Sequence, residues 1–186
     1  MKRIILSLIL TASLFFMSCS IVNNPSTKDT VYKLATLTIV LDSLNLQYDK
    51  VKYLLEHKQR DSKVFTEKEW DKLLDVDSAI TVLSLKYQAI IKLDPSNMSI
   101  HDVILMWQVT KDSYAKAREI VASRLDSFDA SSQVMFKSFD EAAIVASKQI
   151  DALLEDPTND NLKSSLVLLV DVLSLAVKVL SIVAVI

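Results

Sequence analysis

The side chains best suited to catalysis or metal binding are few in this sequence and lie far apart. The 186 residues include two histidines and one cysteine. His57 and His101 each adjoin a carboxylate, Glu56 and Asp102, but they form neither a His pair at a four-residue spacing nor a Glu-x-x-His motif. No Ser-His-Asp arrangement stands out among the many serines. The sequence therefore predicts no catalytic residue, no metal site and no cofactor.

The chain also contains no glycine, where average usage would be about 7%. Glycine-rich phosphate loops, dinucleotide fingerprints and G-x-S-x-G nucleophile elbows are thereby excluded. The 21 basic residues are scattered among 23 acidic ones, and no basic stripe for nucleic acid can be found. We therefore expect a protein that is not an enzyme and has no nucleic-acid partner.

The single cysteine, Cys19, closes an apolar run that follows Lys2 and Arg3. A charged start, an apolar stretch of about 7–15 residues and a small residue before the cut form the secretory pattern. The run is shorter than the roughly 20 apolar residues that a membrane span needs. Residues 1–18 are therefore predicted to be a signal peptide.

The end of this stretch, Phe16-Met17-Ser18-Cys19, resembles the lipobox of bacterial lipoproteins. The resemblance covers only the first nineteen residues, and Phe16 stands where leucine is usual and Met17 where a small residue is usual. It implies that Cys19 carries fatty acyl chains such as palmitate and becomes the new N-terminus. Ser20, rather than aspartate, follows the cysteine, which in Gram-negative lipoproteins implies an outer-membrane anchor facing the periplasm. The alternative is an ordinary secretory peptide with an incidental thiol.

Two segments follow the predicted cleavage. Residues 19–29 read as the lipidated cysteine and a polar tether containing Pro25, and ten such residues extend at most about 33–36 Å. Residues 30–186 have the length of a single domain. Two or more acyl chains hold a protein stably on a bilayer. The predicted partner is therefore a membrane, which the chain contacts through the lipid on Cys19.

Apolar residues recur at steps of three and four from residue 30 to 60 and again from 67 to about 93, which predicts two helices. Thr66 and Glu69 predict a capping box before the second helix. Ser99 is the expected cap of the next periodic stretch, 99–156, which could form one helix of about 58 residues. The segment DSFDASS, 126–132, concentrates residues that compete with helical hydrogen bonds and favours a break there.

These elements predict an all-α fold, an up-and-down bundle of four or five long antiparallel helices. The alternative is one long helix over 99–156 with shorter helices packed against it. Pro157 is expected in the first turn of the last helix, where its missing N–H costs nothing.

Leucine, valine and isoleucine dominate residues 162–186, and the polar positions fall on one narrow stripe: Ser164, Asp171, Ser174, Lys178 and Ser181. A helix that is apolar around most of its circumference is either buried or in a membrane. It could be the central helix of the bundle, a membrane-inserted helix, or a face for a partner helix or for self-association. The candidate membrane or partner face comprises Leu166, Leu169, Leu173, Val177 and Leu180.

The function expected from these features is that of a membrane-anchored cell-envelope lipoprotein that binds, scaffolds or interferes with another envelope component. An alternative is a membrane-active protein of the lysis or pore type whose helix 162–186 inserts into a bilayer. A weaker alternative is a carrier that holds an apolar ligand inside the bundle.

Overall fold

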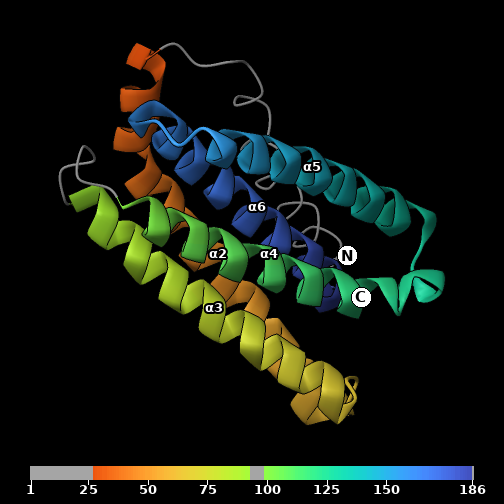
Figure 1. Cartoon of the computed structure of the whole chain (residues 1–186). Helices are drawn as coiled ribbons and strands as arrows, with labels where there is room; N and C mark the ends of the chain where they lie inside the picture. Colours follow the sequence, from red (N-terminus) through yellow and green to blue (C-terminus); the bar gives the residue numbers. More distant parts are fainter. Residues whose placement is uncertain (1–26, 93–98, 186) are drawn as a thin grey trace.

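Five α-helices make up the part of the chain that the computed structural model describes, residues 27–92 and 99–185 (Figure 1). They are α2 (Thr27–Ser62), α3 (Glu67–Lys92), α4 (Ile100–Ala122), α5 (Ala130–Glu155) and α6 (Asn159–Val185), with a single 3₁₀ turn, η2 (Leu125–Ser127), before α5. Consecutive helices run in opposite directions, so α2, α4 and α6 point the same way (Figure 1). The predicted all-α bundle is confirmed.

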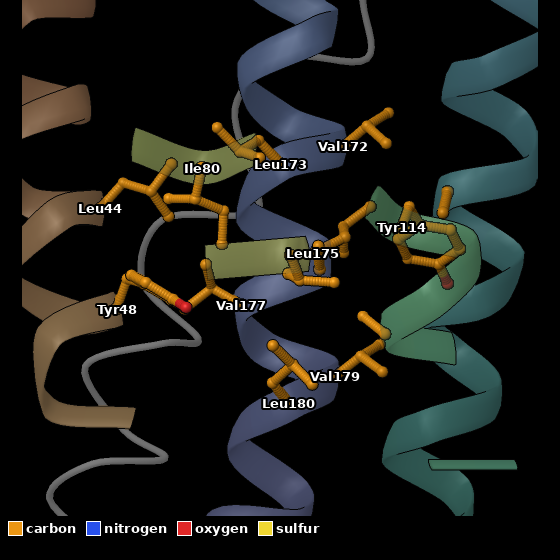
Figure 2. Close-up of a cluster of buried hydrophobic side chains, with 14 of the residues drawn as sticks. Leu44, Tyr48, Ile80, Tyr114, Val172, Leu173, Leu175, Val177, Val179 and Leu180 are labelled. Atoms are coloured by element: carbon orange, nitrogen blue, oxygen red, sulfur yellow. The ribbon is translucent and has the colours of Figure 1, made fainter. Parts of the chain in front are cut away.

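The C-terminal helix α6 lies at the centre of the bundle. It packs against α2, α4 and α5, whereas α3 covers α2 and α4 from outside. Figure 2 shows side chains of α6 reaching both ways, with Leu44 and Tyr48 of α2 on one side and Tyr114 of α4 on the other. A helix that is apolar around most of its circumference is stable in this position because its neighbours remove most of that surface from water.

Two of the three expected cap residues lie at the start of a helix, and one of them makes the expected hydrogen bonds. Glu69 accepts a hydrogen bond of 2.9 Å from the Thr66 backbone N–H and donates its own N–H to the Thr66 hydroxyl at 3.3 Å, so the predicted capping box is confirmed. Ser99 is the N-cap of α4, but its side chain makes no capping hydrogen bond.

The third start differs from the expectation. Pro157 lies outside α6, because the Thr158 hydroxyl accepts a hydrogen bond of 3.2 Å from the Asn161 N–H and so caps a helix that begins at Asn159. A threonine at the N-cap satisfies an open backbone donor, which a proline cannot do. The prediction that Pro157 occupies the first turn is therefore wrong, since Pro157 lies two residues before the first residue of α6.

The stretch predicted as either one helix or two is broken. α4 ends at Ala122, and α5 begins after Asp129, whose carboxylate accepts a hydrogen bond of 2.7 Å from the Ser132 N–H. The serines and aspartates of this segment cap a new helix instead of continuing the old one. A single 58-residue helix is thus excluded, and the favoured break is confirmed.

The two ends of α2 each have a notable feature: the residue after its last turn is left-handed, and its first turn begins earlier than expected. Lys63, directly after α2, has φ 46°, in the left-handed region that glycine usually occupies at helix ends. At the other end, α2 already includes Thr27. The backbone of residues 27–29, predicted as part of the tether, is therefore helical.

Candidate functional site

The strongest site prediction, lipidation of Cys19, falls outside the described residues, as do the signal peptide and the lipobox-like sequence. It stays a prediction. What the structure does describe is the body that such an anchor would hold, from Thr27 onward.

The candidate membrane or partner face of the last helix is buried. Leu166, Leu169, Leu173, Val177 and Leu180 are each at most 1% exposed. Within the described residues, α6 alone is long and apolar enough to cross a membrane, from Asn159 to Ala184, but 83% of its most apolar window is buried inside the bundle. In this conformation α6 is a core helix, and these five side chains are shielded from solvent by the other helices of the bundle.

The polar stripe of α6 reaches the surface only in part. Ser164, Asp171 and Ser174 are half-buried, whereas Lys178 and Ser181 are buried. The Ser181 hydroxyl donates to the Lys178 carbonyl at 2.7 Å. The Lys178 ammonium lies 6.0 Å from the centre of the Phe139 ring on α5. Burial lowers the pKa of Lys178, and the negative charge of Asp171 opposes this shift only partly.

Carboxylates at the helix interfaces are engaged by donors from the neighbouring helix. Asp140 on α5 accepts two hydrogen bonds from the Arg118 guanidinium, at 2.6 and 2.9 Å, and one from the Tyr114 hydroxyl at 3.1 Å. Asp151 accepts from the Trp107 indole N–H at 2.7 Å. The buried aromatic residues of α4, Trp107 and Tyr114, thus pack in the core, while their polar atoms join α4 to α5.

The seam between α3 and its two neighbours is joined in the same way. Lys116 pairs with Asp75 at 2.9 Å, Lys72 pairs with Glu119, and Lys52 on α2 pairs with Asp77 at 2.8 Å. These carboxylates lie in separate ion pairs along the bundle. Their arrangement is that of a structural seam rather than of a catalytic carboxylate pair.

The one histidine with a defined ring contact has no metal-binding neighbour set. The His57 ring contacts the Tyr53 ring at an interplanar angle of 41°, with centroids 3.9 Å apart, and its Nδ1 lies 2.9 Å from the Tyr53 carbonyl oxygen. Over residues 27–92 and 99–185, no three His, Cys, Asp or Glu side chains converge on a point where a metal ion could sit.

A regular row of exposed apolar residues, which sequence reasoning missed, runs along α2. Ile39, Leu46 and Tyr53 are 70%, 63% and 58% exposed. Each lies two residues after a buried member of the same helix, a step of about 200° that places it directly opposite the core. We name these three residues the α2 stripe. Their seven-residue spacing is visible in the sequence, but the stronger periodicity of the buried face obscures it.

Other exposed apolar residues are less regular. They lie on α3 (Leu74, Val82, Leu85), on α4 (Ile100, Leu105), on α5 (Val134, Ile144, Val145) and, as Val64, between α2 and α3. Isolated apolar residues are normal on protein surfaces. A repeat at seven-residue spacing along one helix is different, because it places the side chains nearly in line, where another helix can contact them.

Comparison of the chain with protein-family models, with curated proteins and with solved structures finds no match. Its function must therefore be argued from its own residues.

Proposed function

We propose that the chain is a lipid-anchored protein of the bacterial cell envelope that acts by binding or scaffolding through its helical surface. The observation that carries this proposal is the position of α6. Because the bundle uses its most apolar helix as its own core, that helix is not needed to hold the protein at a membrane. The acyl chains expected on Cys19 are then the simplest attachment.

The distance between anchor and body supports a role close to the membrane surface. Residues 20–26 separate Cys19 from the start of α2, and seven residues extend at most about 25 Å. The start of α2 would therefore stay near the lipid headgroups. We propose the periplasmic face of the outer membrane as the location, because Ser20 follows the cysteine.

Membrane insertion of α6 is the second candidate, and its length and composition are the specific observation that favours it. Insertion would require α6 to leave its contacts with three helices. It would also bring Asp171 and Lys178 into the bilayer, each at about 2.5–3.5 kcal/mol near its centre. The bundle therefore favours α6 as a core helix.

The test is metabolic labelling of the full chain in a Gram-negative host with a clickable palmitate analogue. The expected result is a labelled protein in the outer-membrane fraction and an unlabelled one for the Cys19→Ala variant. A chain that is exported but carries no label at Cys19 would overturn the proposal. A matched control, Ser20→Ala, keeps the thiol and should label normally.

A liposome experiment separates the two candidates. Residues 19–186 carrying Cys19→Ala, the predicted mature chain without its lipid, are purified and mixed with vesicles of phosphatidylethanolamine and phosphatidylglycerol. We expect this chain to stay in the dense fraction on flotation, since α6 is buried. Flotation together with release of a trapped dye would favour the membrane-active function instead.

A further inference from the structure

The α2 stripe is bordered by different charges on its two sides. Three residues after each member stands a carboxylate, and four residues after each member stands a serine, a lysine or a histidine. The first set is Asp42, Asp49 and Glu56, all exposed, and the second set is Ser43, Lys50 and His57. Steps of three and four residues lead to opposite sides of a line along a helix. One edge of the stripe is therefore acidic, and the other carries the positive charge of Lys50.

We propose that the α2 stripe is the contact between two copies of this chain anchored in the same bilayer, with their α2 helices parallel. The proposal rests on the lipid anchor of the proposed function. It commits to a second copy because the two edges complement each other. A two-fold axis along the helices sets the acidic edge of one copy against the Lys50 edge of the other.

The opposite orientation is disfavoured by the same charges. In an antiparallel pair, the two-fold axis is perpendicular to the helices. The acidic edge of one copy then faces the acidic edge of the other, and the two Lys50 edges also face each other. Asp42, Asp49 and Glu56 would then face the same row of the second copy, and like charges at such positions are destabilising. Only the parallel pair brings Asp49 of one copy near Lys50 of the other.

The anchor favours the parallel orientation independently. The start of α2 lies at most about 25 Å from Cys19 along the chain. Two copies held by the same leaflet therefore have their α2 N-termini at the same level above the lipid. A parallel pair requires this arrangement, and an antiparallel pair would have to turn one bundle over.

The contact is expected to be weak in dilute solution. Stable two-stranded coiled coils have two apolar positions in every seven residues, whereas the α2 stripe has one. Confinement to a membrane raises the effective concentration of a second copy and compensates for a small interface. The dimer should thus form on the membrane, while the chain without its anchor is largely monomeric.

Cysteine cross-linking in intact membranes tests this orientation. Ile39→Cys and Tyr53→Cys are introduced singly into the full chain, expressed with its signal peptide, and membranes are oxidised with copper phenanthroline. In the parallel pair, equal positions meet, so each variant should give several-fold more disulfide-linked dimer than the matched control Val134→Cys, which is similarly exposed on α5. Adding Lys50→Glu should reduce the yield, because it makes both edges acidic.

Co-expression of the two variants with different tags gives the outcomes that contradict the proposal. Cross-links between position 39 of one copy and position 53 of the other, without the equal-position products, would show an antiparallel pair. Yields no higher than those of Val134→Cys would show that the α2 stripe is not an interface between copies. If Cys19 is not lipidated, two other measurements detect it: the chain carries no palmitate label, or the unsubstituted chain cross-links through its free Cys19 thiol.

Discussion

Lys58 on α2 donates a hydrogen bond of 3.1 Å from its Nζ to the backbone carbonyl of Val183, in the last turn of α6. The last four carbonyls of a helix lack intrahelical partners, and positive charge is favourable there. The bond joins α2 to α6 through two residues that are 125 positions apart in sequence. Burial, and secondarily the charge of Arg124, lower the pKa of Lys58, so its ammonium group is held in a partly desolvated position.

Lys58→Met should therefore loosen the end of α6. Without the ammonium donor, the final turn loses a capping partner, and we expect faster amide hydrogen exchange at residues 179–184 with little change in the middle of the helix. Native-state exchange measured by NMR or mass spectrometry gives this result directly. The matched control is Lys50→Met, which changes an exposed lysine of the same helix. Equal exchange in both variants would show that the bond does not hold the α6 terminus.

Lys63→Gly should stabilise the bundle by about 0.5–1 kcal/mol. The left-handed conformation at φ 46° costs a side chain with a Cβ about 1–2 kcal/mol, and the greater freedom of glycine in the unfolded chain offsets part of that gain. Urea unfolding followed by circular dichroism measures the difference. Asp61→Gly, two residues earlier and inside α2, should be destabilising. A neutral or unfavourable Lys63→Gly would mean that the turn is not strained.

Much of the bundle could be predicted because its signals are local. The Thr66–Glu69 capping box needs only two residues at the right spacing, and the break before α5 needs only a cluster of cap-forming side chains. The apolar circumference of α6 was also evident from composition, but composition alone left the bundle centre, a membrane and a partner interface open. The exact start of α6 could not be predicted from local signals, because Pro157 suits the first helical position and Thr158 suits the N-cap.

The features that depend on packing were not predictable. Position 178 belongs to the polar stripe of α6, and nothing in the sequence indicates that Lys178 is buried while Asp171, two turns earlier, is half-exposed. The leucines of α2 indicated which side of the helix faces the core. That Ile39, Leu46 and Tyr53 form an exposed row could be seen only in the structure, where no other helix covers that side.

The Glu69 carboxylate should make the stability of the bundle sensitive to acid. Burial acts to raise its pKa, but hydrogen bonds from Arg124 and from the Thr66 backbone and hydroxyl outweigh burial and lower the pKa to about 2. A folded-state pKa below the unfolded value adds stability that is present above about pH 4.5 and is lost as the pH falls toward 2. At about 1.4 kcal/mol per pKa unit, the contribution is on the order of 3 kcal/mol.

Glu69→Gln should remove this part of the pH dependence. We expect a variant that is less stable than the unsubstituted chain at pH 7 and nearly equal to it at pH 2, measured by urea unfolding across that range. Glu67→Gln, an exposed carboxylate of the same first turn, is the control. If the stability curves of Glu69→Gln and of the unsubstituted chain run parallel from pH 7 to pH 2, the ion pair between Glu69 and Arg124 does not cause the acid sensitivity.

Lys178→Met should stabilise the isolated bundle. The lysine is 4% exposed, its ammonium group lies over the Phe139 ring at 6.0 Å, and burial lowers its pKa. Methionine keeps an unbranched apolar side chain in the same space without a buried charge. Replacing a buried charge by an apolar group of similar volume often stabilises a protein, and we expect a gain of at least about 1 kcal/mol at pH 7.

The pH dependence provides the more specific result, because its sign is fixed by the direction of the shift. In the folded chain Lys178 releases its proton at a lower pH than in the unfolded chain, where the pKa is 10.5. At Lys178 the unfolded state therefore binds more protons between these two values, so this residue contributes a rise of stability with pH in that window. Lys178→Met should show a smaller rise, while the exposed Lys148→Met should show the full one. A stabilised Lys178→Met variant whose stability curve keeps the full rise would mean that the gain comes from packing alone and not from removal of the charge.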